Sequence, residues 1–398
     1  MNAIWPSWVE IRLDNIVHNV EEIKKFIGPD VRLIAVVKAN GYGHGGVAAS
    51  WAALKGGADM LGVGSPQEGA ELRKAGVTED ILVLGGAFPD QLDLVVSYDL
   101  IQGVYEKDIL FELDKLAQKA GKPIRIHLKV DTGMGRLGFR PEEMVDIWKL
   151  ILNLKGIKVE GVFSHFATSA PLDREYSNFQ IRRFQKLRNQ FHNMEIHIPL
   201  WHISNSGGIV NLPEACFNMV RSGLLVYGLY PSDKKTSSLN IIPALTWKSR
   251  IVSLKRLHKG ESVSYGRSWI AKKDELIGVI PLGYHDGYDR KLTNRGEVLV
   301  RNKRVKIIGD ICMDNMMVLL TDIPDVRVGD EVVLIGRMGQ ESISPHDVAN
   351  WSQTISYEVL CRIGRRVPRI YSWKDRHIGR SSFLDPSFKI NGLLEKIV

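Results

Sequence analysis

A strand–turn–helix rhythm repeats along this 398-residue chain up to about residue 230. Each unit has a short apolar run, a turn rich in Gly, Ser or Asn, and a segment whose apolar residues follow helical spacing. The apolar runs are continuous rather than alternating, which predicts strands covered on both faces, as in a parallel sheet. The eight runs occupy residues 31–38, 59–65, 81–86, 99–105, 124–132, 157–166, 200–206 and 217–223.

Eight such units predict an α/β fold of the (β/α)8 TIM-type barrel class, because each parallel strand needs a helical crossover and eight strands allow the sheet to close. A doubly wound open sheet is the alternative, and the number of units favours the barrel. The helices of the barrel include one over residues 65–76, which starts with Ser65, Pro66 and Glu68, and one over residues 176–191.

The sequence pattern changes after residue 240, where short strands with turn residues between them predict a mainly β C-terminal domain. One helix, over residues 344–353, interrupts these strands. We therefore expect a barrel over residues 1–240, of which about the first ten residues can pack with the β domain. A β-rich domain over residues 241–380 and a tail of unknown role over residues 381–398 follow.

The composition is that of a globular protein, with 44% hydrophobic and 25% charged residues. The formal net charge is +8, but the basic residues are scattered, so small anionic ligands are expected rather than nucleic acid. The sequence has neither a membrane-spanning apolar run nor the pattern of a secretory signal. Its cysteines, Cys216, Cys312 and Cys361, match neither a disulfide framework nor a zinc site. We expect a cytoplasmic protein with no bound metal.

Two glycine-rich turns follow predicted strands at the end of the barrel where functional groups gather. Lys38 ends the first strand, and an amine held against apolar surroundings has a lowered pKa that suits Schiff-base or proton-transfer chemistry. The fifth strand leads to Lys129, Asp131 and Arg136, and an arginine on such a turn can bind a carboxylate with two parallel bonds. Taken alone, the first turn is also compatible with a solvated strand end, and the second with a helix-capping turn that carries surface charges.

Polar and small residues also end the last three predicted strands of the barrel. The loops after strands 7 and 8 of such barrels commonly bind phosphate through backbone N–H groups and small hydroxyls. A lone histidine at such a position is more often a satisfied core residue than a catalyst. The residues at these three ends are His165, then His202, Asn205 and Ser206, then Arg221, Gly223 and Leu224.

Several motifs, in order and over about residues 5–374, resemble the signatures of the bacterial alanine racemase family of fold-type III pyridoxal phosphate enzymes. No single motif carries the resemblance. The motifs are AVVKANGYGHG, LKVDTGMGRLGF, SHFA, VSYGRSW, LGYHDGYDR, ICMDNMM and TISYEVLCRIGRRVPRIY.

The resemblance implies racemisation of alanine with pyridoxal 5'-phosphate as cofactor, supplying D-alanine for peptidoglycan. Lys38 would bind the cofactor aldehyde covalently and serve as one acid–base group. Tyr265 would be the other, acting on the opposite face of the substrate α-carbon. Because that tyrosine reaches the cofactor of the neighbouring subunit in the family, the resemblance implies a homodimer with shared active sites.

The remaining site residues are assigned by the same resemblance. Arg221 would face the pyridine nitrogen, with His165 against the ring and His202 behind this network. Arg136 and the backbone N–H of Met313 would hold the substrate carboxylate or the cofactor phenolate. The other roles are the phosphate site, formed by Tyr42, Ser206, Gly223, Leu224 and Tyr357, an entrance narrowed by Tyr284 and Tyr357, and a carbamate on Lys129 that would orient Arg136.

Three other functions remain open at this point. Amino-acid decarboxylases on the same two-domain plan use a β-domain cysteine, and Cys312 with Asp314 resembles that arrangement, but Arg221 replaces the carboxylate expected at the pyridine nitrogen. A non-catalytic cofactor carrier would not need Tyr265. Preference for serine, or broader specificity, is the third, because Gly41, Ser222 and Ser268 depart from the usual family motifs.

Overall fold

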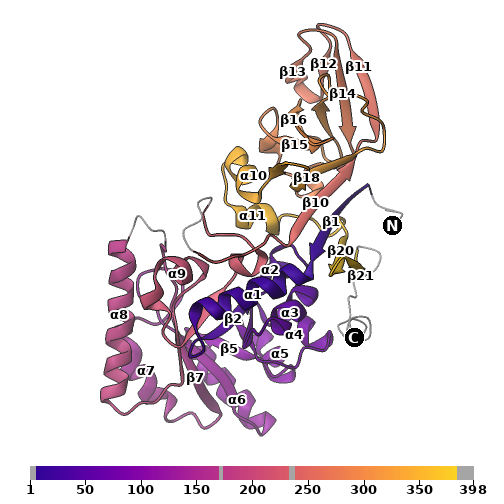
Figure 1. Cartoon of the computed structure of the whole chain (residues 1–398). Coiled ribbons are helices and arrows are strands. Elements are labelled where there is room, and N and C mark those ends of the chain that lie inside the picture. Colours follow the sequence, from indigo (N-terminus) through magenta and orange to yellow (C-terminus); the bar gives the residue numbers. More distant parts are fainter. Residues whose placement is uncertain (1–5, 170–173, 233–237, 383–398) are drawn as a thin grey trace.

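The computed structural model describes residues 6–169, 174–232 and 238–382, and Figure 1 shows a barrel domain with a β domain beside its mouth. Eight parallel strands form one sheet in the order β8-β7-β6-β5-β4-β3-β2-β9. The prediction of a barrel is confirmed, and all eight predicted strands are present. They are β2 (Arg32–Val36), β3 (Met60–Val63), β4 (Ile81–Val83), β5 (Ile101–Val104), β6 (Ile124–Lys129), β7 (Ile157–Phe163), β8 (Leu200–His202) and β9 (Met219–Ser222).

The sheet nearly closes on itself between its two end strands. Beyond β8, the Ser204 carbonyl accepts a hydrogen bond of 2.9 Å from the Arg221 N–H on β9. Strands such as β3 and β5 are buried along their whole length, which explains their continuous apolar sequences. The open doubly wound alternative is therefore excluded.

Helices cover the outside of the barrel and follow its strands. The Ser65 hydroxyl accepts the N–H of Glu68, and Pro66 takes the first helical position, which explains why α4 begins there. The α-helices of this domain are α1 (Leu13–Ile27), α2 (Lys38–Tyr42), α3 (Gly46–Lys55), α4 (Pro66–Lys74), α5 (Leu92–Ser97), α6 (Lys107–Ala120), α7 (Met144–Ile151), α8 (Arg174–Asn193) and α9 (Ser206–Asn211).

The C-terminal domain is built on a long, mostly antiparallel ladder whose path runs from β11 to β21 among the described residues. Its strands are β10 (Leu245–Arg250), β11 (Ser253–Leu257), β12 (Ser262–Val263), β13 (Trp269–Ile270), β14 (Glu275–Ile280), β15 (Glu297–Val300), β16 (Lys303–Ile308), β17 (Met316–Leu319), β18 (Glu331–Met338), β19 (Glu341–Ile343), β20 (Arg369–Trp373) and β21 (Arg376–Ser381). Strands β12 and β13 form a separate hairpin. Two helices, α10 (Pro345–Ser352) and α11 (Ser356–Cys361), face the barrel.

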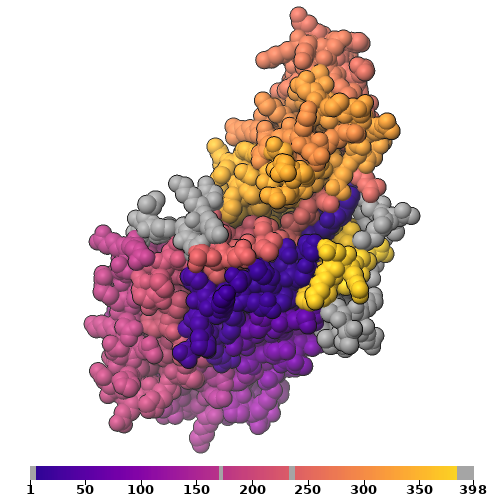
Figure 2. All heavy atoms as spheres, in the orientation of Figure 1, coloured from indigo at the N-terminus to yellow at the C-terminus, as the bar shows by residue number. Residues whose placement is uncertain are grey.

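The N-terminal strand joins the two domains. Strand β1 (Ser7–Arg12) pairs antiparallel with β10 and parallel with β20, so it lies inside the C-terminal sheet. Figure 2 shows this indigo segment directly beside the yellow residues of β20 and β21. The chain then enters the barrel through α1, which follows β1 without a loop. The domain boundaries themselves remain predictions, and the tail over residues 381–398 lies outside the described residues beyond Ser382.

Two features are absent from the described residues. Among residues 6–169, 174–232 and 238–382, no helix is long and apolar enough to cross a bilayer. Within the same ranges, no group of three or more His, Cys, Asp and Glu side chains is placed to hold a metal ion.

Candidate active site

Lys38 lies at the mouth of the barrel, at the start of a left-handed turn. Strand β2 ends at Val36, two residues earlier than predicted, because residues 39–41 take φ angles of 53°, 53° and 61°. The Glu68 carboxylate fixes this turn by accepting the backbone N–H groups of Ala39 and Gly64, each at 2.7 Å. Glu68 therefore ties the turn to the end of the neighbouring strand β3, and this fixes the position of the Lys38 backbone.

The charge on the Lys38 ammonium is disfavoured by its surroundings. Its side chain opens to solvent, yet the protein around it displaces enough water to lower its pKa, and the guanidinium of Arg136 lowers it further. Glu68 opposes this effect, and Arg221 adds to it. A lysine in such a site is more readily available as a neutral amine, which is the form that adds to an aldehyde or accepts a proton.

Arg221, on β9, is buried at the centre of a polar network inside the barrel domain. Its guanidinium donates to Nδ1 of His202 at 2.8 Å and to Nδ1 of His165 at 3.1 Å. Since Arg221 can only donate, His202 carries its proton on Nε2 and donates it to Nδ1 of His127, 2.8 Å away. The Ser164 carbonyl also accepts from Arg221, at 2.7 Å. Burial lowers the pKa of Arg221 to about 9, so its charge is retained at neutral pH.

The ends of β8 and β9 bring several small residues together. The Ser206 hydroxyl accepts the Gly223 N–H at 2.9 Å, and the Asn205 side chain caps α9 by accepting a backbone N–H at 2.9 Å. A Cβ atom on Gly223 would lie only 2.7 Å from the Tyr42 hydroxyl, so glycine keeps this space open. Leu224 follows as the first residue of a 3-10 helix. The predicted phosphate-site residues of the barrel are thus brought together.

Helix α11 brings the β domain to this same mouth. The ring of Tyr357 lies 5.9 Å from that of Tyr42, and the Tyr42 ring lies 5.2 Å from that of Tyr227. Burial raises the pKa of Tyr357 to about 12, so its hydroxyl stays protonated. Cys361, one helical turn later, is close enough for its thiol to influence the pKa of Lys38. The mouth is therefore lined by both domains.

Lys129 ends β6 in a strongly cationic environment. Its side chain is buried, with Nζ 4.5 Å from the centre of the Phe163 ring. Burial, followed by the charges of Arg221 and Arg136, lowers the pKa of Lys129 to about 7. No salt bridge to Lys129 is present among the described residues. Much of this amine is therefore neutral at physiological pH.

The loop that carries Arg136 is organised by Asp131. The Asp131 carboxylate accepts the backbone N–H groups of Gly133 at 2.9 Å, Met134 at 2.8 Å and Gly135 at 2.9 Å. Arg136 itself is exposed. The loop thus presents a guanidinium on a rigid backbone next to Lys38 and Lys129, whose pKa values it lowers.

Replacing Asp131 by alanine should weaken substrate binding more than turnover. Charge-assisted hydrogen bonds contribute about 1.5–3 kcal/mol each, so the loop should lose its fixed geometry and Arg136 its position. We expect KM for the amino-acid substrate that the motifs imply to rise about tenfold or more, with a smaller fall in kcat. Steady-state kinetics check this, with Asp146→Ala as the matched control, because Asp146 is exposed on α7 and forms a salt bridge with Lys149 alone among the described residues. An unchanged KM in Asp131→Ala would contradict the role of this loop.

The remaining predicted residues form a second cluster, on the β domain. Tyr265 lies in a short 3-10 helix beside the β12–β13 hairpin and is 72% exposed. Its neighbour Ser264 contacts Cys312, with Oγ 3.4 Å from Sγ, and the Tyr284 N–H donates to the Cys312 carbonyl at 3.0 Å. Met313 is 52% exposed. In Figure 1 the β12–β13 hairpin lies at the far end of the β domain, away from α2.

Ion pairs made by Arg366 hold this second cluster together. The Arg366 guanidinium donates to both carboxylate oxygens of Asp286, at 2.6 and 3.0 Å, and to Asp314 at 2.6 Å. Asp286 in turn accepts the N–H of Gly283, which precedes Tyr284. Asp314 is therefore a structural partner of Arg366. Sequence reasoning missed Arg366, as it missed Glu68 and His127, because each acts on residues distant in sequence.

The buried histidines should make stability depend on pH. Burial lowers the pKa of His127 to about 3 and that of His44 to about 4, from 6.5 in an unfolded chain. Between pH 6.5 and these lower values, the unfolded chain binds protons at the two histidines that the native chain does not bind. The free energy of unfolding therefore falls as the pH falls through this range. Urea titrations at several pH values should show that His127→Gln reduces the slope by about 1.4 kcal/mol per pH unit.

The matched control for this prediction is His192→Gln, because His192 is exposed near the end of α8. The slope of this control should equal that of the unaltered protein. A His127→Gln variant with the full slope would show that His127 binds a proton in the native state.

Comparison with known proteins identifies the family. The profile "Alanine racemase, N-terminal domain" matches residues 11–231, and "Alanine racemase, C-terminal domain" matches residues 244–371. The alanine racemases of Halothermothrix orenii and Desulforamulus reducens are each 42% identical to the chain over 369 residues. These alignments cover 93% and 92% of this chain and 97% and 99% of the two relatives.

Solved structures agree with this result. An alanine racemase of Clostridium difficile 630 superposes with a TM-score of 0.92 at 34% identity, covering 96% of this chain and 100% of that one. The alanine racemase of Bacillus anthracis with bound L-Ala-P gives a TM-score of 0.91 at 35% identity, with coverages of 96% and 99%. The resemblance predicted from the motifs is confirmed. The chain belongs to the alanine racemase family and is an amino-acid racemase, an isomerase.

Proposed function

We propose that this enzyme interconverts L-alanine and D-alanine with pyridoxal 5'-phosphate, using Lys38 and Tyr265 as its two bases. The observation that carries the proposal is the division of the predicted site into two clusters. Lys38, Arg136 and Arg221 lie at the barrel mouth, whereas Tyr265 is exposed beside the β12–β13 hairpin, which Figure 1 shows at the far end of the β domain. Because one chain does not bring the clusters together, we propose a homodimer in which each site takes Tyr265 from the partner subunit.

The barrel mouth fits this cofactor. The space beside Gly223 is one that a Cβ atom would close, and the hydroxyl of neighbouring Ser222 is buried without a hydrogen-bond partner among the described residues. Ser206, Gly223, Leu224, Tyr42 and Tyr357 would hold the phosphate through hydroxyls and backbone N–H groups. When bound, pyridoxal phosphate supplies an electron sink that makes the substrate α-proton acidic. Lys38 would hold the cofactor through its amine.

The charge on Arg221 sets the acid–base properties of the site. Its guanidinium stays protonated, so it would disfavour protonation of the cofactor ring nitrogen facing it. Its contacts with His202 and His165 fix its orientation. A carboxylate at this position would have the opposite effect, which is why we favour racemisation over the decarboxylase alternative.

Two bases on opposite faces account for inversion at the α-carbon. The Lys38 amine would remove the proton on one face, or its ammonium form would return it, and Tyr265 of the partner subunit would do the same on the other face, as a phenolate when it accepts the proton and as a hydroxyl when it gives it. Arg136 and the backbone N–H of Met313 would hold the substrate carboxylate, so that the α-carbon stays between the two bases. Tyr284 and Tyr357 would narrow the entrance, which favours a small side chain on the substrate. We propose that the D-alanine formed in this way supplies peptidoglycan synthesis in the cytoplasm.

We further propose that Lys129 carries a carbamate. Its buried amine has a pKa near 7 and lies among the charges of Arg221, Arg136 and Lys38, so an anion there would offset a local excess of positive charge. A neutral amine is the form that adds to carbon dioxide. The enzyme equilibrated with ¹³C-bicarbonate should show a carbamate carbonyl signal in its NMR spectrum, and Lys129→Ala should remove it. A signal that persists in Lys129→Ala would exclude this assignment.

The proposed reaction is tested by incubating the purified enzyme with L-alanine in deuterated water. Optical rotation should decay to zero, and α-deuterium should appear in both enantiomers. L-serine in a parallel incubation tests the broader specificity that Gly41, Ser222 and Ser268 leave open, and released carbon dioxide would reveal a decarboxylase. An enzyme that binds the cofactor yet leaves the α-proton of alanine unexchanged would refute the proposal.

A further inference from the structure

The Glu68 carboxylate on α4 connects two backbone segments that flank Lys38. One oxygen accepts the N–H of Ala39, the residue directly after Lys38, and the other accepts the N–H of Gly64, just beyond the end of β3, each at 2.7 Å. Hydrogen bonds from an N–H group to an ionised carboxylate are among the stronger ones in proteins. Both oxygens of Glu68 therefore bind the backbone around Lys38.

These bonds differ from the ones expected of a helix-capping glutamate. Ser65 is the N-cap of α4, and Glu68, three residues later, could accept the Ser65 N–H in a capping box. Among the described residues, the Glu68 carboxylate instead accepts the N–H groups of Ala39 and Gly64. The carboxylate thus stabilises the Lys38 turn rather than the start of its own helix.

The Lys38 side chain passes close to the backbone of Gly64. A Cβ atom on Gly64 would lie 3.6 Å from Cβ and 3.7 Å from Cδ of Lys38, and 3.2 Å from Oε2 of Glu68. The methylene groups of Lys38 therefore lie against the same glycine whose N–H binds Glu68. Through its two oxygens, Glu68 fixes both the backbone that follows Lys38 and the surface along which its side chain extends.

Glu68 also brings a negative charge to a mouth that is rich in cations. Burial lowers the pKa of Lys38 most, followed by the charge of Arg136, whereas the Glu68 carboxylate raises it. An amine that takes a proton from a substrate becomes an ammonium ion, which a nearby carboxylate stabilises. The charged and titratable groups that interact with Lys38 from the surrounding elements are Glu68, Arg136, Arg221, Cys361, Lys129 and His165.

We propose that Glu68 is a positioning residue for racemisation, which holds Lys38 against Gly64 and balances the positive charges around its amine. Glu68 acts through Lys38 rather than on the substrate. The inference rests on the proposed function, because Glu68 matters for turnover only if Lys38 is a base. Without the carboxylate, the amine would be held less firmly and would accept a proton less readily.

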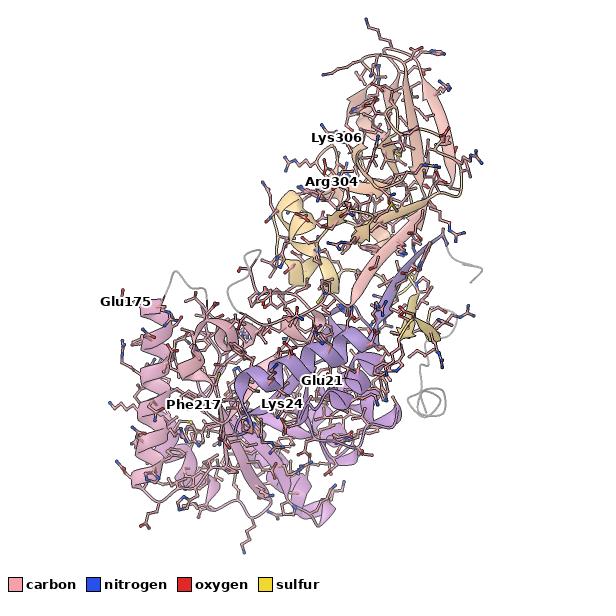
Figure 3. The ribbon with its side chains drawn as sticks, in the orientation of Figure 1. Glu21, Lys24, Glu175, Phe217, Arg304 and Lys306 are labelled. Carbon is pink, nitrogen blue, oxygen red and sulfur yellow. The ribbon has the colours of Figure 1, made fainter. Side chains whose placement is uncertain are left out.

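Chemical labelling measures the effect of Glu68 on the amine without any catalysis. The full-length enzyme, freed of cofactor, is acetylated with acetic anhydride at several pH values, and mass spectrometry gives the rate at Lys38, because the neutral amine is the form that reacts. Lys306, labelled in Figure 3 on the β domain, is exposed and gives the internal reference rate. In Glu68→Gln the titration of Lys38 should move to lower pH by about half a unit or more, since the stabilising charge is lost. Glu68→Asp keeps the charge and should shift the titration less.

Racemisation by the cofactor-loaded enzyme tests the consequence for turnover. Glu68→Gln should lower kcat about 10- to 100-fold and change KM less than about threefold. The acidic limb of its pH profile for kcat/KM should move in the same direction as the Lys38 titration, and Glu68→Asp should recover part of kcat. Glu71→Gln is the matched control and should behave like the unaltered enzyme, because Glu71 is exposed on the same helix.

Three results would overturn the role of Glu68. They are an unshifted Lys38 titration in Glu68→Gln, a kcat equal to that of Glu71→Gln, and equal titration shifts in Glu68→Gln and Glu68→Asp. Retained activity in Lys38→Ala would instead refute the proposed function, whereas an inactive Lys38→Ala with a fully active Glu68→Gln would refute the role of Glu68 alone. Circular dichroism verifies folding, and Glu68→Ser, which leaves room for water at the two N–H groups, replaces Glu68→Gln if that variant does not fold.

Discussion

The Lys38→Ala enzyme is expected to have lost racemase activity by a factor of at least about 10³. The loss would combine two functions, because the amine proposed to hold the cofactor is also the proposed base for one face of the substrate. The left-handed turn and its bonds to Glu68 place this amine at the barrel mouth, where Arg136 helps to lower its pKa. Lys129 is the other lysine whose pKa is lowered by Arg221 and Arg136, but its side chain is buried.

Racemisation rates at saturating cofactor check this prediction. Lys119→Ala is the matched control, because Lys119 is an exposed residue in the last turn of α6. Its activity should equal that of the unaltered enzyme. A Lys38→Ala enzyme that retains more than a few per cent of the activity would show that another group performs both functions.

Tyr265→Phe should reduce racemisation by about 10²- to 10⁴-fold, as expected for the loss of a general acid–base group. The hydroxyl is exposed in the single chain, so its removal should leave the stability of the fold almost unchanged. The matched control is Tyr288→Phe in the same domain, because the Tyr288 hydroxyl is buried and has no hydrogen-bond partner among the described residues. Activity in Tyr265→Phe close to that of Tyr288→Phe would exclude Tyr265 as the second base.

Mixed dimers test whether Tyr265 acts across subunits. Inactive Lys38→Ala and inactive Tyr265→Phe chains, unfolded together and refolded, should form about half mixed dimers if pairing is random. Each mixed dimer would contain one intact site, made of Lys38 from one chain and Tyr265 from the other. The mixture should therefore recover about a quarter of the original activity. No recovery, with mixed dimers verified by mass spectrometry, would mean that the two residues act within one chain.

The sequence was sufficient to predict the barrel because its signals are local. Each strand is a continuous apolar run, and helix starts such as Ser65–Pro66 and Ser344–Pro345 carry their own caps. The end of β2 was predicted two residues late, because Lys38 continues an apolar run in the sequence while the φ angles beyond it turn left-handed. A left-handed backbone conformation is hard to predict from the residue types at these positions, of which only Gly41 strongly favours it.

Residues that act across the fold could not be found in the same way. Glu68 looked like a helix-capping residue, and its bonds to the Lys38 turn exist only because β2 and β3 lie side by side. His127 sits inside β6 among apolar residues, and only the closed barrel brings it to His202. The family resemblance supplied Tyr265, whose separation from Lys38 in one chain appears only when both domains are seen together.

The most direct test of the account is to find where the cofactor is attached. The enzyme loaded with pyridoxal phosphate is reduced with borohydride, digested with trypsin and mapped by mass spectrometry. Modification of Lys38 would block cleavage there, so the account predicts a pyridoxyl label on the peptide spanning residues 33–55. A label on any other peptide, or an unlabelled peptide ending at Lys38 as the sole product from this region, would contradict it.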